Sequence, residues 1–562
     1  ITIIATVFRL VVPIKVGDSV TSVDDYLKGK VTDIEIVEDQ LLWNILILLA
    51  ATLLSALFTF IMRQTFIVVS RYVEYDLKNE IFQHYEKLSL GFYKQNRTGD
   101  LMNRISEDVS KVRMYIGPAL MYSTTTVTLF VVAISYMFYQ DPVLTLYAIA
   151  PLPILSVVIY KVSIIINQRS TVVQQYLSKL TTFTQESFSG IAVIKAYGIE
   201  PRTNANFDEL AEGSKVKNID LAKVQALFFP LMMLLIGVSN ILVIYIGGTR
   251  YMNGQIAEFG TIVEFLIYVN MLTWPVAVVG WVTSMVQQAE ASQKRINEFL
   301  ETEPTIVNLV AEETPVNGNI EFNNLTFTYP DTGITALKDV SFTVKPGETL
   351  AIVGNTGSGK STILELIGRL YDVEEGMLKI DETPIRNINL NNLRNSIGYV
   401  PQDAFLFSDT LRNNIRFGKE NASEEEVIEA AKNAAVHKNI IGFNKGYDTI
   451  LGERGITLSG GQKQRVSIAR AIINDPRILL FDDCLSAVDT ETEEEILQNL
   501  HKISKDKTTI IVSHRISSAK NANKIIVLED GKIIQQGTHN QLVNSEGYYK
   551  ELYAKQLLEK EM

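Results

Sequence analysis

The sequence has 562 residues, of which 47% are apolar, and a net charge of −11 that results from 52 Lys and Arg against 63 Asp and Glu. This length exceeds one ordinary domain, and the apolar share is higher than a soluble protein of this size needs, so the composition predicts several domains and a membrane-embedded part. The acidic charge argues against a nucleic-acid partner, and the single cysteine, Cys484, excludes an internal disulfide and a cysteine-based metal cage.

The N-terminal half contains charge-free stretches close to the roughly 20 residues that are needed to cross a lipid bilayer. The chain opens inside an apolar stretch, ITIIATVFRLVVPIK, without a signal-peptide layout, and we interpret it as the remaining half of a spanning helix. The further predicted spans are residues 41–62, 114–140, 142–160, 224–249 and 265–289. Together they predict a transmembrane domain with six spans.

Long polar segments separate these spans and differ in charge. Residues 63–113 carry nine Lys and Arg, and residues 161–223 carry eight. Residues 16–40 carry only two Lys, together with seven Asp and Glu. The positive-inside rule therefore places the two long segments in the cytoplasm and the third outside. Both long segments have the pattern of helical extensions of the spans. Their tips, around residues 97–108 and 188–202, predict either a turn with a small docking helix or a solvated hairpin bend.

An acidic, proline-containing connector follows the last span and indicates a domain boundary. We expect the transmembrane domain at residues 1–298, the linker at 299–319 and a second domain at 320–562. In the second domain, short β-type runs such as TLAIVG and RILLFDD alternate with helical patterns. This alternation is typical of an α/β domain with a largely parallel sheet. The predicted fold is an all-α transmembrane domain followed by an α/β domain.

The second domain contains GNTGSGKS at residues 354–361, between the apolar run TLAIV and the helical run STILELIGRLY. This is a Walker A pattern in its strand–loop–helix setting, which makes a glycine-rich turn without a nucleotide the weaker alternative. Glycines let backbone N–H groups surround phosphates, Lys360 can reach the β and γ oxygens of ATP, and Ser361 can hold Mg²⁺. The predicted ATP-binding residues here are Gly354, Asn355, Thr356, Gly357, Ser358, Gly359, Lys360, Ser361 and Thr362.

Asp482 ends the apolar run RILLF and is the expected second partner of Mg²⁺. A hard cation that bridges phosphates takes carboxylate oxygens, usually through water. An Asp at the end of a strand is also a common helix N-cap. The distance along the chain from the Walker A pattern favours the metal role.

The stretch LSGGQKQR at residues 458–465 resembles the signature motif of ATP-binding cassette (ABC) proteins. Six spans followed by one cassette resemble a half-transporter of the ABC exporter type, and GERG at residues 452–455 is similar to an exporter-specific stretch that touches the cytoplasmic extensions. The resemblance implies coupling helices around residues 97–108 and 188–202. It also implies ATP-driven export of a hydrophobic or amphipathic compound, such as a drug, lipid or peptide, across a bacterial plasma (inner) membrane, with the cassette in the cytoplasm.

The same resemblance gives roles to single residues. Tyr329 would stack on adenine, Gln402 would be the Q-loop residue that reaches Mg²⁺ and the attacking water, and His514 would be the switch histidine at the γ-phosphate. In the family, two cassettes hold two ATP molecules head to tail, so the signature residues would contact the ATP of a second chain. These residues are Leu458, Ser459, Gly460, Gly461 and Gln462 in the signature, with Ser486, Ala487 and Asp489 in the D-loop.

Asp483 departs from the family pattern, in which a Glu usually follows the Walker B Asp and activates or orients water. Asp is shorter by one methylene, about 1.5 Å, and a misplacement near 1 Å can cost on the order of 10²-fold in rate. We therefore expect this chain's site to bind ATP well and hydrolyse it slowly, as the degenerate site of a heterodimer. The alternative is a homodimeric exporter or lipid flippase with two Asp-containing sites. An ATP-gated channel or regulator is disfavoured because no added regulatory segment is evident.

The last span offers candidate cavity-lining groups in Trp274 and Trp281, with Pro275 as a kink. Bulky aromatic residues on spans are more often packing groups or interfacial anchors. Glu264, near the outer end of this span, is a candidate gate or cation contact, and the alternative is a solvated acid.

Overall fold

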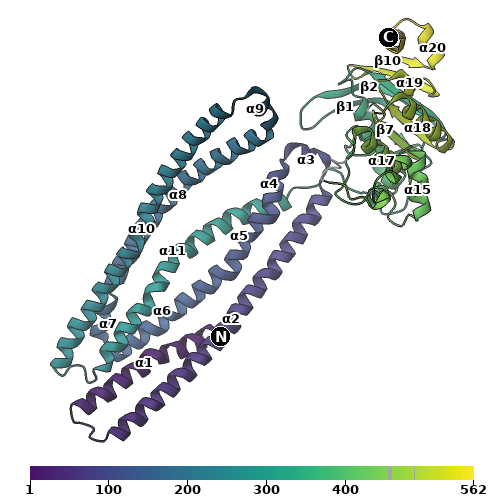
Figure 1. The fold of residues 1–562 in the computed structure, drawn as a ribbon. Helices are drawn as coiled ribbons and strands as arrows, with labels where there is room; N and C mark the ends of the chain where they lie inside the picture. The colour runs from purple at the N-terminus through teal and green to yellow at the C-terminus, as the bar shows by residue number, and fades with distance from the viewer. Residues whose placement is uncertain (453–457, 487, 562) are drawn as a thin grey trace. The chain divides into compact units, whose positions relative to one another are not determined.

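The computed structural model describes residues 1–452, 458–486 and 488–561. The chain forms two compact units (Figure 1). The first consists of Ile1–Gln83 and Leu101–Glu301, and the second of His84–Asp100 and Thr302–Met562. A short segment of the N-terminal half, residues 84–100, therefore packs with the C-terminal unit.

The described residues of the first unit form helices that are joined by short turns and loops. Its helices are α1 (Thr2–Leu27), α2 (Ile34–Lys87, up to Gln83 in this unit), α4 (Thr98–Asn103, from Leu101), the π-helical turn η1 (Arg104–Asp108), α5 (Val109–Met114), the π-helical turn η2 (Tyr115–Ala119), α6 (Leu120–Gln140), α7 (Pro142–Ile149), α8 (Pro151–Ser189), α9 (Ile191–Tyr197), α10 (Glu200–Met252) and α11 (Gly260–Leu300). Five helical stretches are long and apolar enough to cross a membrane: Ile34–Lys87, Thr98–Gln140, Pro142–Ser189, Glu200–Met252 and Gly260–Leu300. They contain the five complete spans that the sequence predicts.

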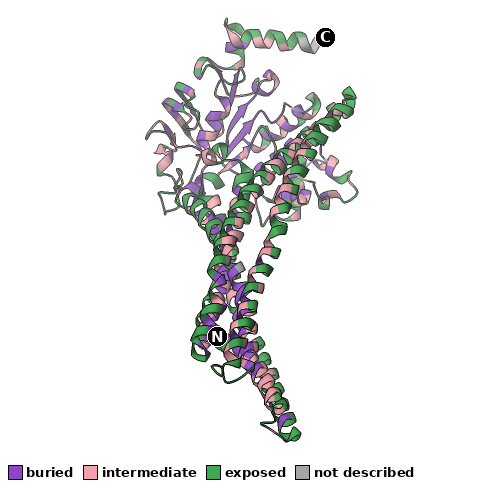
Figure 2. Cartoon of the chain, turned by 90° about the vertical axis from the view of Figure 1, so that its left-hand side faces the viewer, coloured by how far each residue is buried: buried purple, intermediate pink, exposed green. Residues whose placement is uncertain are grey.

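The long helices expose apolar side chains along their length. On α2, Leu42, Trp43, Leu53 and Phe60 are all more than half exposed. Figure 2 shows exposed residues along the helices of the first unit and buried residues on the strands of the second. Such a surface suits a bilayer, because a helix satisfies its own backbone hydrogen bonds and lipid can cover the side chains.

The two predicted tips differ in how closely the structure follows them. The second is the short helix α9 between α8 and α10, and Gly198 ends it with a positive φ of 63°. The first bend lies between the end of α2 and Asn96, whose extended backbone precedes α4, and thus before residues 97–108. Asp108, at the end of the predicted tip, packs against α11 instead: it accepts a hydrogen bond from Ser292 at 2.9 Å and pairs with Arg295.

Glu264 is buried, so the alternative of a solvated acid is wrong. It lies on α11 against Gly17 of α1, where an added Cβ would come within 2.5 Å of the Glu264 Cγ atom. The absence of a side chain at Gly17 thus allows the two helices to enclose this carboxyl. Periodicity alone could not reveal that close approach.

The second unit contains two sheets. Its strands are β1 (Ile320–Thr328), β2 (Thr335–Val344), β3 (Thr349–Gly354), β4 (Leu378–Ile380), β5 (Thr383–Pro384), β6 (Ile397–Val400), β7 (Ile478–Asp482), β8 (Thr508–Val512), β9 (Lys524–Glu529) and β10 (Lys532–Gly537). The larger sheet has the order β10-β9-β3-β8-β7-β6 and is parallel except for β10, whereas β2-β1-β4-β5 form an antiparallel sheet. The expectation of an α/β domain with a largely parallel sheet is confirmed.

The helices of the second unit connect and cover these strands. They are α3 (Leu90–Gln95), α12 (Lys360–Ile367), the 3-10 turn η3 (Ile385–Asn387), α13 (Leu390–Asn395), α14 (Leu411–Arg416), α15 (Glu424–Asn433), α16 (His437–Ile441), the 3-10 turn η4 (Gly446–Asp448), α17 (Gly460–Ile472), α18 (Thr490–Ile503), α19 (Ile516–Ala519), α20 (His539–Asn544) and α21 (Tyr548–Glu561).

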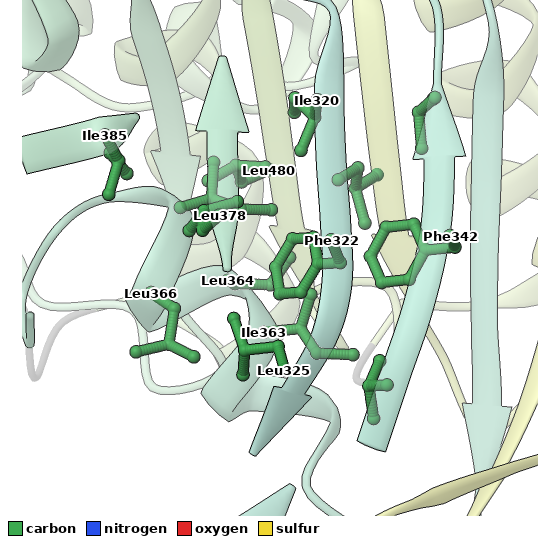
Figure 3. Packing of buried hydrophobic residues seen from close by; sticks show 14 of the residues in the cluster. Ile320, Phe322, Leu325, Phe342, Ile363, Leu364, Leu366, Leu378, Ile385 and Leu480 are labelled. Atoms are coloured by element: carbon green, nitrogen blue, oxygen red, sulfur yellow. The ribbon is translucent and has the colours of Figure 1, made fainter. Parts of the chain in front are cut away.

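A core between the two sheets holds α12 in place. Figure 3 shows Phe322 of β1 beside Phe342 of β2, and the rings stack with centroids 4.4 Å apart. Ile363 and Leu364 of α12 and Leu480 of β7 join the same cluster. Full burial of such a side chain stabilises the fold by roughly 1.5–3 kcal/mol. The apolar face of α12 is therefore anchored to both sheets, which sets the position of its N-terminus.

Candidate functional site

Three parallel strands bring the sequence-predicted residues to one edge of the larger sheet. β3 lies between β8 and β9, β7 lies beyond β8, and Asp482 stands opposite Val512 in the register. The carboxyl ends of these strands therefore carry the Walker A loop, Asp482 with Asp483, and His514. They border a cavity of about 720 Å³, which is within the range of about 300–1,000 Å³ typical of small-ligand sites.

The cavity unites most of the predicted nucleotide site. It is lined by Tyr329, Thr356, Gly357, Gly359, Lys360, Ser361, Thr362, Gln402, Asp482, Asp483 and His514. Gly354, Asn355 and Ser358 belong to the same loop without lining the cavity. No described signature or D-loop residue lines this cavity.

The Walker A loop has the backbone that a phosphate-binding loop requires. Gly359 has a φ of 98°, and an added Cβ would lie 2.4 Å from the carbonyl oxygen of Ala336. Only glycine fits there without a shift of the backbone. Gly359 is the N-cap of α12, and residues 360–362 of the first helical turn line the cavity, so this turn presents the positive end of the helix dipole to it. Ser358 is buried and its Oγ has no hydrogen-bond partner among the described residues.

Lys360 braces this loop. Its buried ammonium donates hydrogen bonds to the carbonyl oxygens of Gly354 at 2.9 Å and Asn355 at 2.7 Å. Burial lowers the pKa of Lys360, and Asp483 and Asp482 oppose this effect. The ammonium is therefore a buried cation within reach of anionic oxygens that enter the cavity.

Ser361 and Asp482 form a pair of oxygen donors beside the loop. The Ser361 hydroxyl donates to Oδ1 of Asp482 at 2.9 Å. Burial raises the pKa of Asp482, while the hydrogen bond from Ser361 works in the opposite direction. A hydroxyl and a carboxylate next to a phosphate-binding loop fit Mg²⁺, which takes few protein ligands and completes its shell with water and phosphate oxygens. The exposed Gln402 lines the same cavity and has an amide oxygen to offer.

Asp483 has an unusual backbone. Its φ is 42°, in the left-handed region, where Asp and Asn are the most tolerant residues after Gly. Its N–H donates to the carbonyl oxygen of Val512 at 2.9 Å, and its Oδ1 accepts the N–H of His514 at 3.4 Å. The carboxylate is thus held toward the end of β8.

His514 follows β8 and faces the same cavity. Burial and the positive charge of Lys360 lower the pKa of His514, and Asp483 partly opposes them. The imidazole is consequently neutral at pH 7 and can both donate and accept a hydrogen bond.

Tyr329 directly follows β1 and is half-buried. Its hydroxyl lies 2.8 Å from Oγ1 of Thr362 and donates to Glu365 at 2.9 Å, which joins the ring to α12. The Lys94 ammonium lies 5.1 Å from the ring centroid and 3.7 Å from Glu365. Sequence reasoning missed both Lys94 and Glu365. Lys94 belongs to the segment that precedes the predicted first tip, and no local motif links it to this site.

We expect Tyr329→Ala to weaken ATP binding by about 1 kcal/mol, or roughly fivefold, through lost stacking and burial. Tyr329→Phe keeps the ring and loses only the contacts of the hydroxyl, so its effect should be smaller. Equilibrium binding of a fluorescent ATP analogue to both variants measures this difference. An equal loss in the Phe variant would show that the bonds to Thr362 and Glu365, and not the ring, support binding.

The signature residues lie at the start of α17. Ser459 caps this helix: its Oγ accepts the N–H of Gln462, and the Gln462 side chain accepts the N–H of Ser459 at 3.0 Å. Ser459 and Gly460 are exposed, Gly461 is half-buried, and Leu458 is buried. The start of α17 is therefore partly open to solvent and lies outside this chain's own nucleotide cavity.

The D-loop residues connect to Asp483. The Ser486 hydroxyl donates to the carbonyl oxygen of Asp483 at 2.8 Å, and Arg515 donates to the carbonyl oxygen of Ser486 at 2.9 Å. Asp489 caps α18 by accepting the N–H of Thr492. Ala487 and residues 453–457, which include most of GERG, lie outside the described residues.

Comparisons with known proteins relate both halves of the chain to ABC transporters. Residues 1–276 match the family of ABC transporter transmembrane regions, and residues 337–486 match the ABC transporter family. The chain is 37% identical to the multidrug resistance-like ATP-binding protein MdlA of Escherichia coli over 92% of its own length and 88% of that protein. It is 36% identical to an ATP-dependent lipid A-core flippase of Syntrophus aciditrophicus, over 86% of this chain and 80% of the flippase.

The fold is also that of a solved exporter. A bacterial Atm1-family ABC exporter with ATP bound superposes with a TM-score of 0.81 at 26% identity, over 98% of this chain and 96% of the other. The transmembrane helices and the cassette are both included in this coverage. The chain therefore belongs to the ABC transporter family, as an exporter half-transporter with one transmembrane region and one ATPase domain that drives transport.

Proposed function

We propose that this chain is the slow-hydrolysing half of a heterodimeric exporter, which moves a hydrophobic or amphipathic compound across a bacterial plasma membrane. The observation that carries the proposal is Asp483, which stands in an otherwise complete nucleotide site. Lys360, Gln402 and His514 line the same cavity, so the departure is confined to one carboxylate. The curated relatives named above come from bacteria and are described as a multidrug resistance-like protein and a lipid A-core flippase, which supports export of amphipathic compounds.

The residues of the cavity have separable tasks. The first turn of α12 and Lys360 bind the phosphates, and Tyr329 holds the adenine ring. Ser361, Asp482 and Gln402 would hold Mg²⁺, which neutralises phosphate charge when bound. The neutral His514 donates a hydrogen bond at the γ-phosphate, since its lowered pKa keeps one nitrogen free to accept and one to donate. Asp483 is left to orient water, with a side chain one methylene shorter than Glu.

The backbone of Asp483 strengthens the case for slow hydrolysis. Its Oδ1 accepts the His514 N–H at 3.4 Å, which ties the carboxylate to the residues that follow β8. The exposed N-terminus of α17 would meanwhile complete the ATP site of the partner. The two ATP sites of the heterodimer would therefore differ. The partner's site is completed by the intact signature of this chain, whereas the site that contains Asp483 hydrolyses ATP slowly.

Restoring the side-chain length tests this assignment. Asp483→Glu should raise hydrolysis at this chain's own site by on the order of 10- to 100-fold, because the carboxylate regains its reach. Asp483→Asn should change total turnover of the heterodimer by less than about twofold, because most turnover comes from the partner site. Steady-state ATPase activity of the purified complex, with nucleotide trapping in each chain, measures both effects.

The two variants control for each other. Asn tolerates the left-handed backbone as Asp does, so Asp483→Asn tests the effect of the negative charge alone. Glu is less suited to a φ of 42°, so a thermal melt must show that Asp483→Glu is as stable as the unmodified chain. A purified homodimer whose activity collapses with Asp483→Asn would contradict the asymmetric scheme. It would establish the alternative, a homodimeric exporter or flippase in which Asp itself works as the catalytic group.

A further inference from the structure

Two arginines of the apolar helices meet at one cavity of the first unit. Arg9 of α1 and Arg63 of α2 line a space of about 180 Å³, together with residues of α6 and α11. The rest of the lining is apolar or uncharged, and includes Met62, Met121 and Trp274. The cavity is far from any motif of the nucleotide site in sequence, and it belongs to the membrane-spanning unit.

Arg9 lies at the level of the apolar part of α2. The Ser55 hydroxyl donates to the carbonyl oxygen of Ala5 at 3.0 Å, and Phe8 stacks on Phe58 with centroids 6.0 Å apart. Ser55 and Phe58 belong to the charge-free stretch 41–62, and Arg63 follows it directly. Arginines within or next to membrane-spanning stretches usually face a cavity or an internal partner, because lipid does not solvate their charge.

Arg9 and Arg63 are both exposed, and their guanidinium groups are unpaired in the part of the chain that the structure describes. No ion pair or hydrogen bond joins Arg9 or Arg63 to another described residue, and no Asp or Glu lines the cavity. Other arginines of this unit are paired: Arg113 lies 3.4 Å from Glu74, and Arg250 lies 3.1 Å from Asp141. The fold therefore neutralises other arginines of this unit and leaves the two at the cavity available for an anion.

The cavity also provides a wall for a hydrocarbon. Met62 and Met121 are buried, and methionine adapts its shape to irregular apolar ligands. Trp274 is 66% exposed, and Tyr122 packs edge-on against Trp281 at 5.4 Å. Because cavities for whole drug-sized ligands measure about 300–1,000 Å³, this one suits a head group whose tail lies outside along the exposed indole.

We propose that Arg9 and Arg63 bind the anionic head group, a phosphate, sulfate or carboxylate, of an amphipathic substrate whose apolar tail packs against the methionines and Trp274. Guanidinium groups bind such oxyanions through paired, charge-assisted hydrogen bonds. The assignment deepens the proposed function and rests on it, because it names the substrate class of the exporter. A membrane phospholipid and a free amphiphile share this chemistry.

The binding test uses Trp274 as its reporter. The chain has three tryptophans, so Trp43→Phe and Trp281→Phe leave Trp274 alone. Without nucleotide, 12-bromododecanoate should quench its fluorescence at a concentration about tenfold lower than the neutral 12-bromododecanol, because only the anion gains the charged contacts. Phosphatidylglycerol without bromine, added in a second arm, identifies a membrane lipid as the source if it reverses the quenching by the dodecanoate, and a free amphiphile if it does not.

Variants of the two arginines make the test specific. The Arg9→Gln, Arg63→Gln double variant should lose the preference for the anion, and the matching Lys double variant should keep part of it, since it retains the charge. Arg71→Gln is the control. Arg71 also lies on α2, but it pairs with Glu74, so its substitution should leave the preference for the anion unchanged. Equal quenching by the acid and the alcohol, or a preference that survives in the Gln variant, would overturn the assignment.

Measurements of ATPase activity separate this inference from the exporter proposal. If the anion binds but no amphiphile stimulates hydrolysis by the dimer, the cavity assignment stands and the substrate-driven exporter fails. If amphiphiles stimulate hydrolysis while the binding preference is absent, the exporter stands and the cavity assignment fails.

Discussion

Gly461→Asp is expected to abolish nearly all ATP hydrolysis by the assembled transporter while leaving this chain folded. Gly461 lies in the first turn of α17, directly after the exposed cap Ser459 and Gly460. An Asp there places a negative charge where the partner's γ-phosphate would bind. Two like charges about 4 Å apart repel by about 4 kcal/mol at an effective dielectric constant near 20, which corresponds to a loss on the order of 10³-fold.

The same substitution should not unfold the helix. A negative side chain in the first turn is favourable for the helix dipole, and Gly is a poor helix former, so the thermal midpoint should stay the same or rise. Gly461→Asn is the matched control, because it adds a side chain of the same shape without the charge. Steady-state ATPase activity of both variants measures the loss of hydrolysis, and a thermal melt of both measures their stability. Similar activity in the Asp and Asn variants would remove this position from the partner's phosphate site.

Lys360→Ala should weaken ATP binding at this chain's own site by about 10- to 100-fold. A hydrogen bond to a charged group contributes about 1.5–3 kcal/mol, and Lys360 is the buried cation of the cavity's phosphate loop. The substitution also removes the brace between the ammonium and the carbonyl oxygens of Gly354 and Asn355. Labelling with a photoreactive ATP analogue should therefore fall in this chain and persist in the partner.

Lys338→Ala is the control for Lys360. Lys338 lines the same cavity but is exposed at its rim, so its loss should change labelling by less than about twofold. Equal labelling of Lys360→Ala and the unmodified chain would contradict the placement of the phosphates at this loop. A fall in both variants would instead indicate a general electrostatic effect of the cavity.

The sequence by itself determined the parts of this protein that depend on contiguous residues. The Walker A loop needs a strand, glycines and a helix in succession, and residues 349–367 contain all three. Spans are equally local, since about 20 apolar residues suffice to cross a bilayer. Asp482 was recognisable because it ends a fully buried apolar run, and β7 is indeed buried at every position. The fold class and the ATPase family followed from these patterns.

Only the tertiary structure decided which distant residues meet. Strand order brings Asp482 beside Ser361, and the segment 84–100 joins the second unit and adds Lys94 to the nucleotide cavity. Periodicity indicates which face of a helix is apolar, but it does not name the helix that covers that face.

The same limit applies to single side chains whose role depends on a neighbour. The left-handed backbone of Asp483, the burial of Glu264 against Gly17, and the meeting of Arg9 with Arg63 each require the packing of separate elements. Such contacts arise from shape and register between segments far apart in the chain, and a local pattern of residue types carries no record of them.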